Sequence, residues 1–260
     1  MIKVRVFATE LLAAVYVAAK TEGLIMAREG PVLGLATGAT PVNLYRQLVN
    51  LHRQGLSFAR TTTVNLDEYV GLSTDHVQSY HRFMREHLFD HIDIPPEQTF
   101  IPDGMADDLA SECSRYDDII TTHPVDLQIL GIGRNGHIGF NEPDTSMKAL
   151  THVQTLTPET VATNARFFAN AAQMPQHAIT MGLQSILRAK AIILMAFGED
   201  KAWSVQRAMS GEISPSLPAS FLQMHADVTF VLDIAAARRL VRNSSGTPDW
   251  DVALLEERAL

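Results

Sequence analysis

One stretch, PVLGLATGATP at Pro31–Pro41, contains a buried strand, a glycine turn and the start of a helix in succession. Its apolar first half predicts a strand that is buried on both faces. Gly38 tolerates a positive φ in the turn, while Thr40 and Pro41 suit the cap and the first turn of a helix. A strand that passes through such a turn into a helix is the repeating unit of α/β folds.

The same alternation continues on both sides of this stretch. Apolar runs predict further strands at residues 1–7, 62–66, 125–130, 191–197 and 228–232. Apolar residues at helical spacing follow several of these strands, and we expect helices near 40–51, 77–91, 109–120, 200–210 and 234–241. Short buried strands separated by helices predict an α/β fold with a mostly parallel sheet between helical layers. With no convincing linker, residues 1–260 should form a single domain.

The composition argues against some classes of function. Of the 260 residues, 46% are hydrophobic and 19% are charged, which is typical of a packed globular domain. The net charge of -8 argues against a nucleic-acid partner, because such a partner needs a basic face. The lone Cys113 cannot form an intrachain disulfide, and no apolar run predicts a membrane span or a secretory leader. We therefore expect a cytoplasmic protein without a nucleic-acid or membrane partner.

The turn after the first quoted strand is a candidate anion site. Ligands of parallel sheets bind beyond the carboxyl ends of the strands. There the segment formed by Thr37, Gly38, Ala39 and Thr40 exposes backbone N–H groups at the positive end of a helix dipole. The segment predicts a phosphate site, and the alternative is an ordinary capped turn.

A carboxylate follows the next predicted strand. Asp67 lies within Asn65–Tyr69, at the same edge of the expected sheet. Isomerisation of a sugar phosphate requires a base that moves a proton between adjacent carbons, and Asp67 suits that role. The alternative is an aspartate that caps the following turn.

A glycine-rich loop, Gly131–His137, contains a formal GxGxxG after a strand. A dinucleotide site would need a helix next, but Gly139, Asn141 and Pro143 break any helix there. We interpret the loop instead as one that brings backbone close to a ligand.

The same loop presents Asn135, His137 and, slightly later, Glu142. Histidine titrates near neutrality, and a nearby carboxylate can orient it and favour its charged form. This pair suits the opening of a pyranose ring, and the alternative is a histidine that only makes hydrogen bonds within the loop.

Two cations are candidate phosphate ligands. Arg166 lies within Asn164–Phe168 and Lys201 follows the strand at 191–197, although either could equally be a solvated surface charge. A metal site is disfavoured, because the spacing of these residues fits an amphipathic helix better than a ligand set: Asp75, His76, His81, His87 and His91.

Together these segments resemble the glucosamine-6-phosphate deaminase family, from about Val4 to Leu240. The resemblance rests on GLATGATP at 34–41, NLDEYVGL at 65–72, GIGRNGHIGFNEP at 131–143, NARFF at 164–168 and LQMH at 222–225. It implies a modified Rossmann-like three-layer α/β/α fold and a cofactor-free conversion of glucosamine 6-phosphate to fructose 6-phosphate and ammonia. Residues 151–175 would form part of a mobile lid.

The resemblance also implies roles for the site residues. Asp67 would move the proton between C2 and C1, and His137 would open the ring with help from Asn135 and Glu142. The segment 37–40, Arg166 and Lys201 would hold the 6-phosphate. Family members carry either Asp or Asn at position 135, and many carry Gly where this chain has Ala39.

Three other functions compete with deamination of glucosamine 6-phosphate. They are deamination of galactosamine 6-phosphate, lactone hydrolysis by a 6-phosphogluconolactonase of the same fold, and non-catalytic sensing of a sugar phosphate. The candidate acid–base set favours the deaminase. Regulated family members bind the phosphate of an activator, N-acetylglucosamine 6-phosphate, with Arg and Lys, where this chain has His152 and Gln154. We therefore expect an unregulated enzyme that is a monomer or homo-dimer.

Overall fold

The computed structural model describes residues 2–168, 170, 173–240 and 251–255. Within this part of the chain, eight strands form one sheet in the order β11-β1-β10-β9-β6-β2-β3-β5, and each pair of neighbours is parallel. In chain order these strands are β1 (Lys3–Phe7), β2 (Val32–Leu35), β3 (Thr62–Asn65), β5 (Thr99–Phe100), β6 (Leu127–Leu130), β9 (Ala191–Ala196), β10 (Val228–Asp233) and β11 (Asp251–Leu255).

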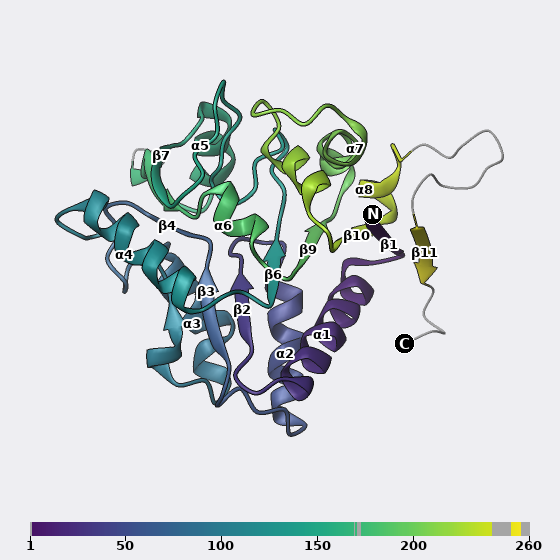
Figure 1. Cartoon of the computed structure of the whole chain (residues 1–260), viewed down its shortest axis with the longest axis horizontal. Helices are drawn as coiled ribbons and strands as arrows, with labels where there is room; N and C mark the ends of the chain where they lie inside the picture. The colour runs from purple at the N-terminus through teal and green to yellow at the C-terminus, as the bar shows by residue number, and fades with distance from the viewer. Residues whose placement is uncertain (1, 169, 171–172, 241–250, 256–260) are drawn as a thin grey trace.

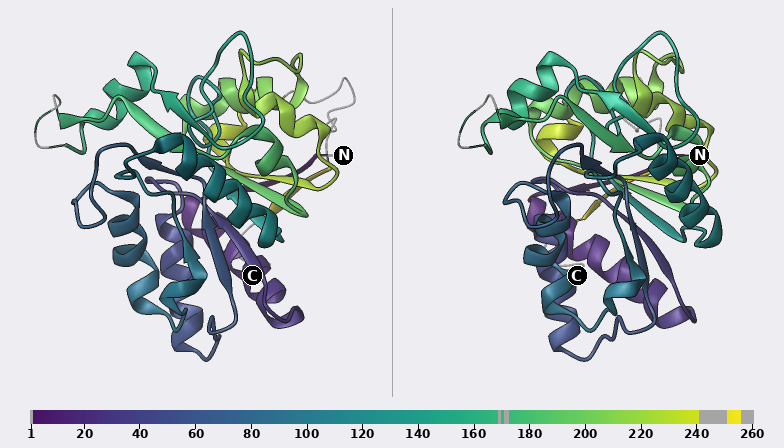
Figure 2. Two further views of the ribbon diagram at one scale, coloured as in Figure 1. Left: turned by 60° about the vertical axis from the view of Figure 1, so that its left-hand side comes forward. Right: turned by 90° about the vertical axis from the view of Figure 1, so that its left-hand side faces the viewer.

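Helices cover both faces of this sheet (Figures 1 and 2). The α-helices are α1 (Glu10–Ala27), α2 (Val42–Arg53), α3 (Tyr80–His87), α4 (Leu109–Thr122), α5 (Pro158–Ala165), α6 (Leu183–Leu187), α7 (Ala202–Ser210) and α8 (Ile234–Ala237). Short 3-10 turns are η1 (Phe89–His91), η2 (Pro96–Gln98), η4 (Glu199–Lys201) and η5 (Pro218–Met224).

Two hydrophobic clusters lie on opposite faces of the sheet because side chains alternate along each strand. In β9, Ile193 and Met195 join the cluster with α1, α2 and α3, whereas Ile192 and Leu194 join the one with α4, α6, α7 and α8. Figure 2 shows the purple and blue helices on one side of the sheet and the green helices on the other. The predicted three-layer α/β/α class with a parallel sheet is confirmed.

A second, antiparallel sheet was not predicted from the sequence. It contains β4 (Asp67–Tyr69), β8 (His177–Thr180) and β7 (His152–Thr155), in the order β4-β8-β7. β4 has only three residues and β7 lacks an apolar run, so neither segment has the pattern of a strand. The small sheet begins where the chain leaves β3, and it carries the segment with Asp67 away from the main sheet.

Other expectations hold with shifted boundaries. The helix expected near 77–91 begins only at Tyr80, because Ser79 caps it by accepting a hydrogen bond from the Arg82 backbone N–H at 3.1 Å. Cys113 is buried in α4 as a free thiol. In the described residues, no helix has both the length and the apolar character needed to cross a membrane.

Candidate active site

A pocket of about 330 Å³ opens beyond the carboxyl ends of the central strands. Turns after β2, β6 and β9, the start of β4 and helix α5 contribute its walls. Except for Glu142, the predicted site residues line it: Thr37, Gly38, Ala39, Thr40, Asp67, Asn135, His137, Arg166 and Lys201. The structure therefore brings together residues that lie more than 160 positions apart in the sequence.

The turn after β2 has the conformation expected of an anion site. Gly38 has a φ of 87°, which glycine adopts at little cost, and Ala39 is exposed at the pocket. The prediction that Thr40 caps α2 is wrong: Pro41 occupies the cap position, and the helix has no side-chain cap. The N–H groups at this helix start therefore have no side-chain oxygen competing with a bound anion.

Cationic side chains gather near this turn. Burial lowers the pKa of Lys201, and the neighbouring charges of Arg134 and Arg166 act in the same direction. Arg166 packs over the Phe167 ring at 4.8 Å from its centroid. Because like charges held close together repel, a doubly charged phosphate placed among them would relieve that repulsion.

Asp67 is a buried carboxyl, 5% exposed, at the first position of β4. Burial raises its pKa well above the ordinary value, and the neighbouring charge of Glu68 raises it further. A carboxylate in such surroundings is a stronger base than an exposed one, which matches the demands of proton abstraction near neutral pH.

His137, Glu142 and Asn135 form a second group. Glu142 is 1% exposed and lies behind the histidine, with its Oε2 3.4 Å from His137 Nδ1, a separation suited to an ion pair. Asn135 Nδ2 donates to the same Glu142 oxygen at 2.8 Å, and Asn135 Oδ1 accepts from the His137 backbone N–H at 3.2 Å. Asn135 thus holds the backbone of His137 and the carboxylate of Glu142, rather than the imidazole ring.

The pKa of Glu142 moves in the direction opposite to that of Asp67. Burial alone would raise it, but contacts with His137, Thr160 and Asn135 outweigh burial and leave the pKa of Glu142 below its ordinary value. Glu142 is therefore an anion at neutral pH.

The sequence predicted that no helix follows the glycine-rich loop directly, and this is confirmed. After β6 the next α-helix is α5, which begins at Pro158. A Cβ added to Gly133 would lie 2.5 Å from the His137 ring, so glycine is required there for close approach. In the described residues no cluster of three or more His, Cys, Asp or Glu side chains is arranged to hold a metal ion.

Comparison with known proteins places this site in a family. Residues 8–231 match the family model described as glucosamine-6-phosphate isomerases/6-phosphogluconolactonase. The chain belongs to this family.

Several relatives in the family are close in sequence. Glucosamine-6-phosphate deaminase 1 of Bacillus subtilis is 51% identical over 219 residues, covering 84% of this chain and 90% of the relative. Glucosamine-6-phosphate deaminase of Thermoanaerobacter pseudethanolicus is 47% identical over 234 residues, covering 89% and 90%.

Solved structures share the fold of this chain. A monomeric glucosamine-6-phosphate deaminase is 48% identical, with a TM-score of 0.89 over 91% of this chain and 99% of the other. A 6-phosphogluconolactonase from Trypanosoma brucei is 20% identical with a TM-score of 0.75, covering 93% and 99%, and shares the fold.

Some pocket residues of this family member were missed from the sequence. Arg134 lines the pocket and pairs with Asp200 at 2.7 Å, whereas the predicted site residues of this loop were its neighbours Asn135 and His137. An arginine in a glycine-rich loop after a strand was the available signal. Tyr80 also lines the pocket, but its helical spacing indicated only a core position.

Helix α5 and the turn after it contribute Glu159, Thr160, Thr163, Asn164 and Phe167 to the pocket wall. They lie in the range expected to form a lid, residues 151–175, of which 169, 171 and 172 lie outside the described residues. Asn164 Nδ2 donates to the Tyr69 hydroxyl at 3.1 Å and so joins α5 to β4.

Proposed function

We propose that this chain converts glucosamine 6-phosphate and water to fructose 6-phosphate and ammonia. The observation that carries the proposal is a pair of unlike carboxyl groups at one pocket: the basic Asp67 lines it, and the ionised Glu142 lies behind His137, which also lines it. Environments that push two carboxyl pKa values apart are typical of separate acid–base roles. Relatives about half identical to this chain carry the name of this deaminase, which supports the same reaction.

Ring opening is the proposed task of His137. It would transfer a proton between the anomeric hydroxyl and the ring oxygen, with the Glu142 carboxylate stabilising the charged imidazole. Asn135 would hold His137 and Glu142 in place, because it bonds the backbone N–H of the histidine and the carboxylate of the glutamate.

Isomerisation and deamination follow on the open chain. Asp67 would remove the C2 proton, giving an enolamine, and return a proton to C1, giving an imine at C2. Water then adds to C2 and ammonia leaves, so the ketone of fructose 6-phosphate forms without any oxidant. Asp67 lines the pocket, and its raised pKa suits both the removal and the return of the proton.

The 6-phosphate would occupy the cationic end of the pocket. The N–H groups at residues 37–40 and the side chains of Arg166 and Lys201 would bind it, with Arg134 as a third cation. Helix α5 would close over the substrate as the lid, because it carries pocket residues and contacts β4 through the bond from Asn164 to the Tyr69 hydroxyl.

We further infer a monomer without phosphate activation. Burial lowers the pKa of His152, which makes it a poor cation. Its Nδ1 lies 2.8 Å from the Leu150 carbonyl, and Gln154 Nε2 donates to the Thr155 carbonyl at 2.8 Å. The monomeric deaminase of similar structure supports this assignment. The single cysteine of the sequence fits the expected cytoplasmic location, which stays a prediction.

An assay that couples ammonia and fructose 6-phosphate formation tests the proposal. Glucosamine 6-phosphate should yield both products in equal amounts, with a hyperbolic rate curve that N-acetylglucosamine 6-phosphate leaves unchanged. Galactosamine 6-phosphate and 6-phosphogluconolactone are run in parallel. Hydrolysis of the lactone without release of ammonia from either amino sugar would contradict the proposal.

A further inference from the structure

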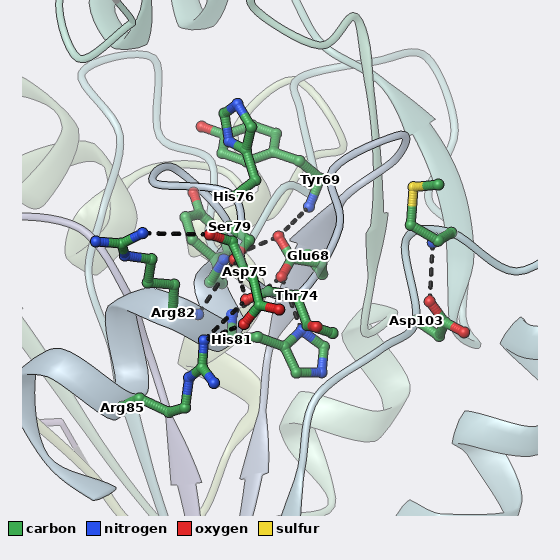
Figure 3. A network of polar contacts seen from close by, with 12 residues as sticks. Glu68, Tyr69, Thr74, Asp75, His76, Ser79, His81, Arg82, Arg85 and Asp103 are labelled. Carbon is green, nitrogen blue, oxygen red and sulfur yellow. Dashed lines mark hydrogen bonds and ion pairs between the residues drawn. The ribbon is translucent and has the colours of Figure 1, made fainter. Parts of the chain in front are cut away.

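Glu68 follows Asp67 in β4 and is fully buried, at 0% exposure. Because successive side chains of a strand point to opposite sides, Asp67 faces the pocket while Glu68 faces the start of helix α3. Figure 3 shows the Glu68 carboxylate surrounded by Tyr69, Ser79 and His81.

The Glu68 carboxylate binds the first turn of α3. Its Oε1 accepts from the backbone N–H groups of Tyr69 at 2.8 Å and Tyr80 at 3.0 Å. Its Oε2 accepts from the His81 backbone N–H at 3.1 Å and lies 3.0 Å from His81 Nδ1. Tyr80 and His81 are the first two residues of α3, whose N–H groups lack partners inside the helix and favour a negative charge.

These bonds join two walls of the pocket. α3 supplies Tyr80, which lines the pocket, and β4 supplies Asp67. The Tyr80 ring lies 4.9 Å from the Tyr69 ring and stacks at 6.1 Å on Phe140. One buried carboxylate therefore fixes both the strand that carries Asp67 and the helix beside it.

Glu68 also supplies the negative charge next to Asp67. Four tyrosines from four elements also interact with Asp67: Tyr45 of α2, Tyr69 of β4, Tyr80 of α3 and Tyr116 of α4. Burial raises the pKa of each of them, that of Tyr69 to about 12, so they stay neutral where a carboxyl titrates. On the pocket side, His137 faces the same space as Asp67.

Charges farther along α3 are already paired. Arg82 Nε lies 2.7 Å from Glu86, and Arg85 lies 2.7 Å from Asp75. Both pairs are largely exposed and contribute a screened field. The carboxylate of Glu68, with His81 against it, is therefore the dominant ionic neighbour of Asp67 among the described residues.

We propose that Glu68 is a positioning residue for the reaction: it holds Asp67 through helix α3, and its charge makes Asp67 a stronger base for the C2 proton. The inference rests on the proposed function, in which Asp67 is that base. Glu68 acts through Asp67 and α3 rather than on the substrate.

The charge is tested with Glu68→Gln in the full-length chain. Glutamine can keep the bonds that Oε1 accepts from the Tyr69 and Tyr80 N–H groups, but it loses the negative charge and the bond that Oε2 accepts from the His81 N–H. Asp67 then ionises more readily, so the acid limb of kcat/KM against pH should move to lower pH by about 1 unit. The weaker base should also lower kcat by roughly 3- to 10-fold, with KM within about twofold of wild type.

The geometry is tested with Glu68→Asp. This variant keeps the charge but shortens the side chain, so its acid limb should stay in place while kcat falls. Glu86→Gln is the matched control, because it makes the same chemical change on an exposed residue of α3. It should leave both the limb and kcat unchanged.

An acid limb and kcat that match wild type in Glu68→Gln would overturn the inference, as would a limb that moves to higher pH. If Glu68→Gln does not fold, Glu68→Asp decides alone: a moved limb or a wild-type kcat would overturn the inference. Ammonia release by wild type is measured in the same series. A wild type that releases none overturns the proposed function itself, and the inference falls with it.

Discussion

Two buried carboxyl groups at the pocket, those of Asp67 and Glu142, have pKa values that are shifted in opposite directions. Burial raises the pKa of Asp67, at the start of β4, and the neighbouring charge of Glu68 raises it further. Glu142, five residues after the glycine-rich loop, is 1% exposed, but its contacts with His137, Thr160 and Asn135 outweigh burial and lower its pKa. Burial therefore raises the pKa of a carboxyl unless hydrogen bonds and a cation offset it, as the partners of Glu142 do.

The largest effect should come from Asp67→Asn. Removing the base should lower kcat by about 10⁴-fold while an unreactive substrate analogue still binds with near wild-type affinity. The measurement is turnover together with transfer of hydrogen from C2 to C1, with Asp75→Asn as an exposed control. Hydrogen transfer at the wild-type rate would show that another group is the base.

The second-largest effect should come from the pair formed by His137 and the Glu142 carboxylate. His137→Ala should lower kcat/KM by about 10²–10⁴-fold, and Glu142→Gln by less, because it removes only the charge that supports the histidine. If both act in ring opening, the double variant should be no slower than His137→Ala alone. Losses that multiply in the double variant would assign Glu142 to a different step.

A smaller effect is expected at the cationic end of the pocket, where the 6-phosphate is proposed to bind. Arg166→Ala and Lys201→Ala should each raise KM for glucosamine 6-phosphate by about 10- to 100-fold, since charge-assisted hydrogen bonds are lost. Lys190→Ala, which removes an exposed lysine paired with Asp126, is the control. Equal losses on free glucosamine would mean that these residues act on stability rather than on the phosphate.

The smallest effect is on stability, where the two carboxyl groups should have opposite signs. Asp67 has a folded pKa above its ordinary 3.8, so its ionisation destabilises the fold as pH rises. Glu142 has one below 4.5, so its charge stabilises the fold above that pH and the benefit is lost on acidification.

At pH 7, Asp67→Asn should therefore raise Tm and Glu142→Gln should lower it, each by roughly 2–4 °C if about 1 kcal/mol is involved. Thermal unfolding followed at pH 7 and pH 4 checks the sign. If Tm changes in the same direction in both variants, the ionised forms of Asp67 and Glu142 do not have opposite effects on stability.

The sequence predicted six of the eight strands of the main sheet and most of the pocket, because the apolar runs of β2, β6, β9 and β10 are unambiguous and the polar residues follow them directly. It did not predict the two edge strands, β5, which has only two residues, and β11. It missed the small sheet, whose strands are held by pairing with β8 rather than by an apolar pattern. It also missed Arg134 and the role of Glu68. Their contacts, Asp200 and the start of α3, are set by tertiary packing that no local pattern reports.

The most direct test is a carbon-13 NMR titration of the side-chain carboxyl groups in the ligand-free protein. Asp67→Asn and Glu142→Gln assign the two resonances by their disappearance. Asp67 should titrate above its ordinary 3.8 and Glu142 below its ordinary 4.5, with the pKa of Asp67 the higher of the two. If Glu142 instead takes up its proton at a higher pH than Asp67, the assignment of base and fixed charge is contradicted.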